Sequence, residues 1–175
     1  MPATPELIAR AQVGDEQAME RIIFAYQGRV GAMVISIMGN DDDWEDVCQQ
    51  IFVKMVLGLR RLKRVDLFEP WLFRIARNAA LDHLRRRRTR RFLVPWQKSH
   101  DSIAAMPELE LNLENAALDA AISQLPADQR ELMVLIRDRH WKYSRISAIT
   151  GQSVAAIKSR VFRLRRRLRR LVLDV

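Results

Sequence analysis

The sequence predicts an all-α protein made of two small helical domains joined by an extended linker. Apolar residues recur at three- and four-residue spacing along most of the chain, and no segment has the strict alternation of a strand. The 175 residues include only six glycines and six prolines, and most of these fall where a helical pattern would break. A stretch from about residue 93 to residue 112 contains two prolines and has little period. It therefore separates two helical regions.

The first helical region runs from about Thr4 to Gly39, with a break where Asp15 can cap a second helix. The aspartate run Asp41–Asp43 then opens the next helix, because negative charge is favoured at a helix N-terminus. That helix begins at Trp44. We expect it to bury a stripe made of Val47, Cys48, Ile51, Phe52, Met55 and Leu59.

A third long helix follows a basic connector. Asp66 and Glu69 have the spacing of a capping box, and Pro70 falls in the first turn, where proline is tolerated. The helix continues into Arg85–Arg91, where six of seven residues are arginine. Its predicted buried residues are Phe68, Leu72, Ile75, Ala76 and Ala79.

Composition changes from basic to acidic after the arginine block. We therefore place one domain at residues 1–94, a linker at 95–112 and a second domain at 113–175. The second domain shows four helical segments, at about residues 113–125, 127–139, 143–150 and 153–171. The last two have the layout of a helix-turn-helix, in which Gly151 takes the left-handed conformation and Ser153 caps the second helix.

The second helix of this motif has one apolar and one basic face. The apolar face comprises Val154, Ile157, Val161, Leu164, Leu168 and Leu171, and we expect it to be buried. The opposite face carries Lys158, Ser159, Phe162, Arg163 and Arg166. An exposed aromatic ring among cations suits contact with DNA, where cations hold phosphates and apolar groups touch thymine methyls. The alternative is an ordinary basic surface helix with Phe162 tucked against a neighbour.

Two polar faces of the first domain are further candidates. On the helix from Trp44, one is formed by Asp46, Gln49, Gln50, Val53 and Lys54, and periodicity alone indicates a solvated face. On the following helix, Arg74, Arg77, Asn78, Asp82 and Arg85 share the polar side, where Asn and Arg can read bases and neutralise phosphates. Asp82 is placed to orient Arg85 or Arg86. Phe68 and Trp71 could stack on single-stranded bases or belong to the core.

Charge and residue types restrict the function classes. A net charge of +9 favours a polyanionic partner, either nucleic acid or an anionic membrane. The single cysteine excludes an intramolecular disulfide and a cysteine metal cluster, and no signal peptide or membrane span is visible, which predicts a cytosolic protein. His83, His100 and His140 follow no metal-ligand spacing, and no nucleophile–base pair is legible. We therefore expect no metal site, no cofactor, no small-molecule substrate and no enzymatic activity.

Four segments, in order, resemble the extracytoplasmic-function (ECF, group 4) sigma factors of bacterial RNA polymerase. They are "WEDVCQQIFVKM", "FEPWLFRIARNAALDHLRRRR", "LPADQRELMVL" and "ITGQSVAAIKSRVFRLRRRL". The resemblance implies a sigma-2-like helical bundle followed by a sigma-4-like helix-turn-helix domain. It also implies a non-enzymatic subunit that binds core RNA polymerase, through the β′ clamp helices and the β flap, and directs it to promoter DNA.

The resemblance implies a role for each candidate surface. Polymerase contacts would be Asp46, Gln49, Gln50 and Lys54. The residues that melt and read the −10 element would be Lys63, Arg64, Arg74, Arg77, Asn78, Asp82, Arg85 and Arg86. The −35 element would be bound by Arg145, Ser153, Lys158, Ser159, Phe162, Arg163 and Arg166. The arginines from Arg86 to Arg91 would clamp the phosphates of duplex DNA just upstream.

Family likeness also implies an anti-sigma factor, often anchored in the membrane, that covers the polymerase-binding faces. The chain departs from the family pattern at Gln50, where a Glu is usual, at Arg145 and Ser147 in the first helix of the motif, and at Ala155-Ala156. Two other readings stay open at this level. A free-standing helix-turn-helix regulator accounts for the C-terminal half alone, and a basic RNA-binding or architectural protein accounts for the charge alone.

Overall fold

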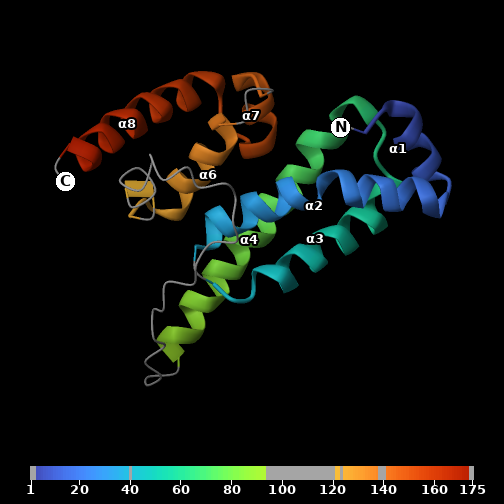
Figure 1. Cartoon of the computed structure of the whole chain (residues 1–175), viewed down its shortest axis with the longest axis horizontal. Coiled ribbons are helices and arrows are strands. Elements are labelled where there is room, and N and C mark those ends of the chain that lie inside the picture. The colour runs from blue at the N-terminus through green and yellow to red at the C-terminus, as the bar shows by residue number, and fades with distance from the viewer. Residues whose placement is uncertain (1–2, 40, 94–120, 123, 138–140, 174–175) are drawn as a thin grey trace.

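The computed structural model describes residues 3–39, 41–93, 121–122, 124–137 and 141–173, and every regular element in these ranges is helical (Figure 1). The prediction of an all-α fold is therefore confirmed. The predicted linker lies outside the described residues, and so does most of the predicted helix at 113–125. The elements are α1 (Pro5–Gln12), α2 (Glu16–Met38), α3 (Trp44–Leu59), the 3₁₀ turn η1 (Val65–Leu67), α4 (Phe68–Leu93), α6 (Ala127–Arg137), α7 (Tyr143–Thr150) and α8 (Val154–Leu173).

Helix α2 is the base on which the N-terminal domain packs. Its start is fixed by Asp15, whose carboxylate accepts from the Ala18 amide at 3.0 Å, as predicted. Tyr26 is fully buried near the middle of α2, and its hydroxyl accepts from the Ala3 amide. Ile22, Val30 and Val34 continue the buried side, against which α1, α3 and α4 lie.

Helix α4 begins differently from the prediction. The carboxylate of Asp66 accepts from Arg64 at 2.6 Å, and that of Glu69 accepts from Arg29 and Arg145. The expected capping box is therefore wrong, because both side chains are taken by arginines. The turn η1 leads the chain into α4 instead.

Helix α4 lies at the centre of the molecule. Phe68, Leu72, Ala76 and Ala80 are fully buried or nearly so, and α4 contacts α2 and α3 on this side. The two alanines let the helix backbones approach closely, since an alanine adds little bulk. Beyond them the C-terminal half of α4 projects past the other helices (Figure 1).

The C-terminal domain contains the predicted helix-turn-helix. Gly151 ends α7 with φ 72°, in the left-handed region, and the Ser153 hydroxyl accepts from the Ala156 amide at 3.2 Å. The apolar face of α8 is buried as expected at Ile157, Val161, Leu164 and Leu168. Val154 is an exception with 36% exposure, because it lies in the first turn, before α8 reaches its neighbours.

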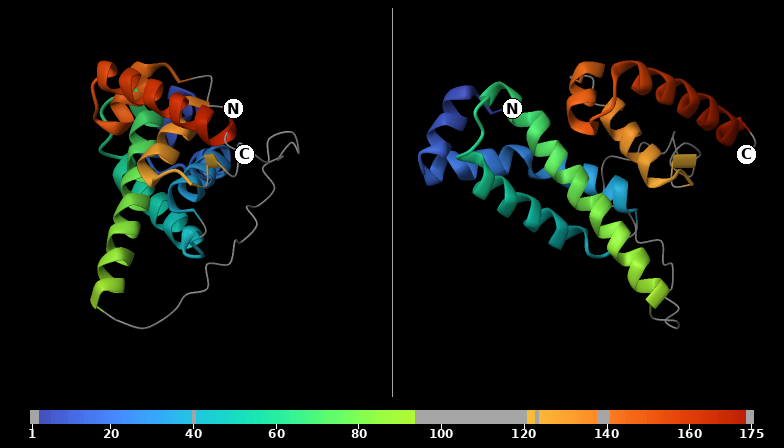
Figure 2. Two further views of the ribbon diagram at one scale, coloured as in Figure 1. Left: turned by 90° about the vertical axis from the view of Figure 1, so that its left-hand side faces the viewer. Right: turned by 180° about the vertical axis from the view of Figure 1, so that it is seen from behind.

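The two domains pack against each other. Helix α6 contacts α2 and helix α7 contacts α4, while α8 lies on the outside (Figure 2). The rings of Phe73 and Trp141 meet edge to face with centroids 4.6 Å apart. Arg130 of α6 donates to the carbonyl oxygens of Ser36 and Ile37, both at 2.8 Å. These carbonyls end α2 and lack helical partners, so the second domain satisfies them. No helix in the described ranges has the length and apolarity needed to cross a membrane.

Two helical glycines give a matched test of this packing. A Cβ at Gly58 would lie 2.8 Å from the Trp71 ring, whereas one at Gly28 would meet nothing within 4 Å. We expect Gly58→Ala to lower the free energy of unfolding by about 1–3 kcal/mol through overpacking. Gly28→Ala should raise it by about 0.5–1 kcal/mol because alanine favours the helix. Denaturant unfolding measures both, and equal effects would contradict the Trp71 contact.

Candidate nucleic-acid interface

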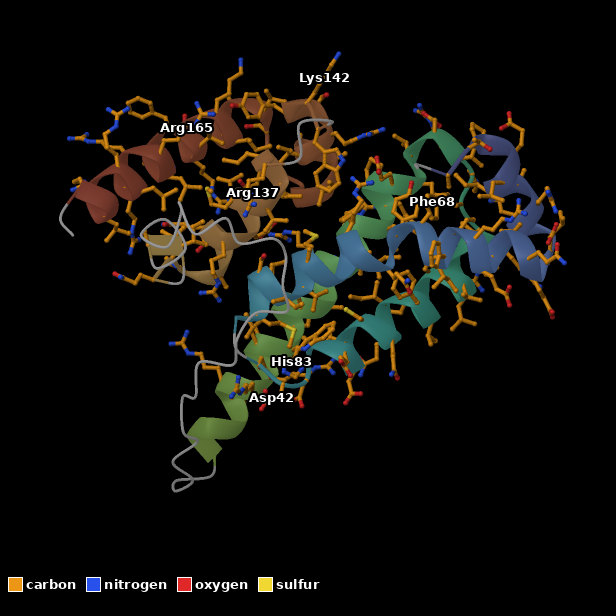
Figure 3. The ribbon with its side chains drawn as sticks, in the orientation of Figure 1. Asp42, Phe68, His83, Arg137, Lys142 and Arg165 are labelled. Carbon is orange, nitrogen blue, oxygen red and sulfur yellow. The ribbon has the colours of Figure 1, made fainter. Side chains whose placement is uncertain are left out.

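The basic face of α8 is open to solvent. Lys158, Ser159, Phe162, Arg163 and Arg166 are all exposed, and Phe162 is 70% exposed. The alternative in which Phe162 tucks against a neighbour is therefore wrong. Figure 3 shows the side chains that stand out along this helix, with Arg165 labelled. A helix of this shape, with an aromatic ring between cations, can enter a DNA major groove.

Other basic residues of α8 contact α6 and the turn that precedes α8. Arg160 donates to Asp128 Oδ2 and to Gln152 Oε1, both at 2.8 Å, and Arg167 donates to Gln129 at 3.3 Å. These contacts fix the rotation of α8 about its axis. The exposed set is thereby presented on one side.

The polar side of α4 forms a second basic surface. Arg74 and Asn78 are exposed, as are Lys63 and Arg64 in the connector. Asp82 pairs with Arg85 at 2.9 Å, which confirms its predicted orienting contact. Arg86 is also exposed.

The two aromatic candidates of this surface are not equally available. Phe68 is 1% exposed and lies between α2 and α4, so it belongs to the core (Figure 3). Trp71 is half-buried over Gly58.

Two predicted DNA contacts point across the domain interface. Arg77 Nε donates to Glu131 Oε1 of α6 at 2.5 Å, and Glu131 is only 1% exposed. Burial raises the pKa of Glu131, and Arg77 only partly offsets this. Arg145 donates to Glu69 Oε2 of α4 at 2.7 Å. Sequence periodicity had no signal for these pairs, because their members lie far apart in the chain.

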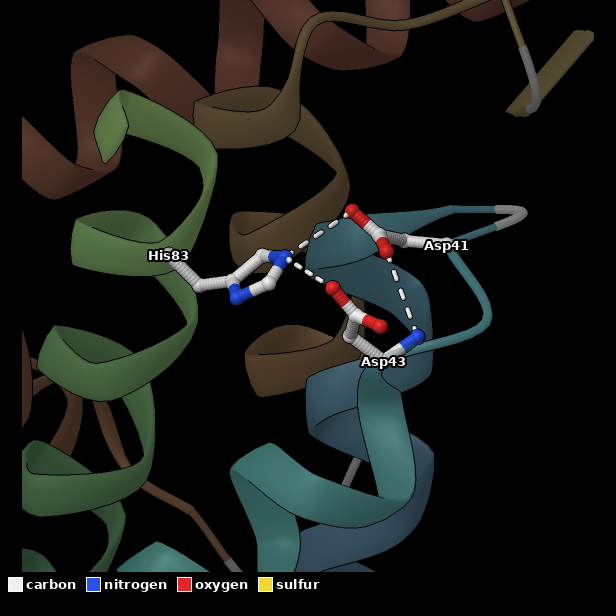
Figure 4. Close-up of side chains that lie close together, drawn as sticks. All are labelled: Asp41, Asp43 and His83. Carbon is white, nitrogen blue, oxygen red and sulfur yellow. Dashed lines mark hydrogen bonds and ion pairs between the residues drawn. The ribbon is translucent and has the colours of Figure 1, made fainter. Parts of the chain in front are cut away.

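The structure also brings His83 to the aspartate run Asp41–Asp43, which is distant from it in the sequence. The His83 ring nitrogen lies 3.2 Å from Asp41 Oδ2 and 3.5 Å from Asp43 Oδ2, where α4 passes the start of α3 (Figure 4). Arg87 donates to the same Asp41 oxygen at 2.7 Å, and Asp41 Oδ1 accepts from the Asp43 amide. Arg87 already supplies a positive charge to the buried Asp41 carboxylate. The cluster therefore joins α4 to the α2–α3 connection, and Arg87 is not a free phosphate clamp in this arrangement.

A third surface combines a polar face with an apolar groove. Asp46, Gln49, Gln50 and Lys54 are exposed along α3, around Val53. Beside them, α2 and α3 border a groove of about 900 Å³. Val53 and Leu57 are 57% and 73% exposed there. The predicted stripe of α3 included Cys48 and Phe52, which line this groove and are half-buried, but the groove itself was not predicted. The exposed apolar residues Val53 and Leu57 were the signal that could have found it.

Cys48 also borders the groove, and burial raises the pKa of its thiol to about 11. The thiol is therefore protonated at neutral pH, which makes it a poor nucleophile.

Two family models match the two domains. The model of sigma-70 region 2 matches residues 22–90, and that of sigma-70 region 4 matches residues 115–168. The chain is 34% identical to the ECF RNA polymerase sigma factor EcfG of Rhodopseudomonas palustris, over 81% of this chain and 77% of that protein. It is 30% identical to the ECF RNA polymerase sigma-E factor of Escherichia coli K12, over 91% and 88% of the two chains. A probable RNA polymerase sigma factor, RfaY of Xanthomonas campestris, is 31% identical over 95% of this chain. The match covers only 43% of the length of RfaY.

Two solved structures share the fold. One is CnrH in complex with the cytosolic domain of CnrY, with a TM-score of 0.69 and 27% identity over 96% of this chain and 95% of that chain. The other is the sigma factor RpoE of Bartonella quintana in complex with the anti-sigma factor NepR, with a TM-score of 0.72 and 29% identity over 89% and 96%. The domains, their order and these likenesses define a bacterial transcription factor of two helical modules. The chain belongs to the sigma-70 family, in its ECF group of RNA polymerase sigma factors.

Ser153 allows structural and DNA-binding roles to be separated. Ser153→Ala removes the cap of α8 and should cost about 1 kcal/mol of unfolding free energy. Ser153→Asp keeps a capping oxygen, so stability should stay near that of the wild type, but it adds a negative charge beside the predicted DNA surface. We therefore expect Ser153→Asp to weaken binding to a −35 duplex, measured by fluorescence anisotropy. Unchanged binding by this variant would place Ser153 away from DNA.

Proposed function

We propose that this chain binds core RNA polymerase and directs it to promoters by reading a −10 element with its first domain and a −35 element with its second. The observation that carries this proposal is the exposed face of α8, with Phe162 open among Lys158 and Arg163. In this proposal the chain binds DNA and polymerase, and the polymerase carries out the catalysis. Membership of the sigma-70 family supports both steps.

In the second domain, α8 would lie in the major groove of the −35 element. Arg163 and Lys158 could donate to base acceptors such as guanine O6 and N7, and Phe162 could pack on a thymine methyl. Ser159 and Ser153 can donate to phosphates near the start of the helix. Arg166, a turn further on, adds a cation for the backbone.

In the first domain, the connector and α4 would open and hold the −10 element. Arg74 and Asn78 are exposed on the reading side, and Asp82 holds Arg85 in place. Each captured base contributes about 1–3 kcal/mol, so a few captures can offset the cost of unpairing an A·T-rich segment without ATP. Lys63, Arg64 and Arg86 would neutralise phosphates around this site.

Polymerase would dock on α3. Asp46, Gln49, Gln50 and Lys54 offer hydrogen bonds and both charges, while the adjoining groove offers apolar area to a helix of the β′ clamp. The second domain would contact the β flap. An anti-sigma factor would compete for these surfaces; the similar sigma factor RpoE is in complex with the anti-sigma factor NepR. The protein would act in the cytoplasm, and a membrane-anchored anti-sigma factor would recruit it to the inner membrane face.

Mixing the purified chain with core RNA polymerase tests the docking step. We expect promoter-specific transcripts, and we expect Asp46→Arg combined with Gln49→Ala to weaken core binding by roughly tenfold or more through like-charge contact and a lost hydrogen bond. The control is Glu20→Arg combined with Gln17→Ala on α2, which makes matched changes at exposed sites. If the wild-type chain forms no complex with core polymerase, the proposed function is wrong. A free-standing helix-turn-helix regulator then becomes the better account.

A pair of arginines on α8 tests the −35 assignment. Arg163→Ala should reduce the preference for a promoter over a scrambled −35 sequence by about 1–3 kcal/mol, because a base contact is lost. Arg165→Ala, on another side of the same helix, should weaken both sequences alike through lost charge. Competition binding at fixed salt measures the two ratios. Equal losses of sequence preference in both variants would contradict a base contact by Arg163.

A further inference from the structure

Helix α1 reaches the connector between α3 and α4, residues 60–67. The Gln12 side-chain amide donates to the backbone carbonyl oxygen of Leu59 at 3.0 Å and to that of Leu62 at 2.8 Å. Leu59 is the last residue of α3, and Leu62 lies in the connector. Figure 1 shows the connector passing beside α1, and α1 also contacts η1. One side chain therefore ties the end of α3 and the connector to a helix that lies 47 and 50 positions away in the sequence.

The end of α3 explains why this donor matters. The last carbonyl groups of a helix have no amide of a further turn to pair with. The Leu59 oxygen accepts from the Leu62 amide at 3.0 Å and from Gln12, so two donors close the turn after α3. Both bonds of Gln12 are partly buried, and a carbonyl that loses its donor away from water is costly. Loss of the Gln12 amide is therefore expected to loosen this turn and the residues directly after it.

Helix α1 is a fixed base for the Gln12 side chain. Ile8 and Ala11 are 2% and 1% exposed, and α1 packs on α2. Arg10 of α1 also pairs with Asp15, the N-cap of α2, at 2.6 Å. Gln12 is the last residue of α1. Because α1 is held to α2 in this way, the core of the first domain sets the position of Gln12, and Gln12 in turn sets the path of the connector.

The connector carries two exposed cations between two held points. Leu62 is held by the bond from Gln12, and Val65 is half-buried and packs against the core. Lys63 and Arg64 lie between them and are exposed. The Arg64 guanidinium is also directed from one side, since its Nη2 donates to Asp66 Oδ2 at 2.6 Å and its Nε to Oδ1 at 3.2 Å. The backbone that presents both cations is therefore anchored on each side of them.

We propose that Gln12 is a positioning residue for the −10 element, which holds the connector so that Lys63 and Arg64 meet the captured strand in a prearranged geometry. The inference rests on the proposed reading of the −10 element by the connector and α4, and it adds α1 to that site. Gln12 acts through two backbone carbonyl groups and not by contact with DNA. A segment that is already ordered loses less conformational entropy on binding, so the same contacts yield more affinity.

Two substitutions of Gln12 that differ in charge test this inference. Gln12→Met keeps a side chain of similar size and removes both donors, whereas Gln12→Glu removes them and adds a negative charge. Each variant is assembled with core polymerase and compared on two promoters that share a −35 element, one with the intact −10 element and one with a scrambled −10 element. We expect both variants to lower the preference for the intact −10 element by about tenfold, because two hydrogen bonds that order the connector are lost. Open-complex formation, followed by the permanganate reactivity of unpaired thymines, should slow in parallel.

The matched controls are Gln17→Met and Gln17→Glu, at an exposed glutamine of α2. Both should keep the wild-type preference for the intact −10 element. The preference for an intact over a scrambled −35 element should be unchanged in all four variants, because the exposed face of α8 lies in the other domain. Affinity for core polymerase should also be unchanged, because the proposed docking residues lie between Asp46 and Lys54 and not at the end of α3.

A loss of −10 preference in Gln12→Glu alone would assign the effect to charge and overturn the positioning role. Equal losses of −10 and −35 preference would overturn it as well, because they indicate a general loss of structure. A variant that is less stable in thermal unfolding is still informative, since both preferences are ratios and do not depend on the amount of folded protein. If the wild-type holoenzyme itself ignores the −10 sequence, the proposed function is wrong at this step and the inference falls with it. If the wild type discriminates and both Gln12 variants do so equally well, the inference alone is wrong.

Discussion

Helix α4 has to be buried on two sides, and most of the structure follows from this constraint. Leu72 and Ala76 seal one side against α2 and α3, while Phe73 meets Trp141 of the second domain on the other. Between Phe68 and Ala80, the exposed residues of the helix are Arg74 and Asn78. The residues proposed to read the −10 element are thus oriented by the packing behind them. A rotation of α4 would expose apolar side chains before it moved the reading residues far.

A second constraint on this basic chain comes from its buried acidic residues, which pair with arginines. Within the described residues, three carboxylates are buried, namely Asp41, Glu69 and Glu131. Each bonds to an arginine expected at DNA: Arg87, Arg145 and Arg77, respectively. A buried carboxylate without a cation would be costly, and an arginine beside it loses part of its freedom to bind phosphate. The same three pairs therefore stabilise the fold and limit the charge offered to DNA.

The fold was predictable from sequence where it depends on local chemistry. The Asp15 cap and the Gly151–Ser153 turn follow from spacing and residue type, and both are found in the structure. Of the predicted stripe of α3, Val47, Ile51, Met55 and Leu59 are buried, while Cys48 and Phe52 are half-buried. Contacts between residues distant in the chain were not predictable. Arg77 and Glu131 are 54 positions apart, and Glu69 and Arg145 are 76 apart. Periodicity places each of them on a polar side but cannot say which polar group faces it. The capping box failed for this reason, since tertiary arginines took Glu69 from its own helix.

The ion pairs of Arg77 and Arg145 with buried acids affect DNA specificity, because the chain has a high net positive charge. Non-specific DNA binding is nearly all electrostatic. The logarithm of the binding constant falls with the logarithm of the salt concentration, and each phosphate contact adds about 0.9 to the steepness of that fall. A chain of net charge +9 would otherwise be held by the ~10⁶–10⁹ non-specific sites of a genome. Pairing Arg77 and Arg145 with acids lowers this background without altering the exposed face of α8.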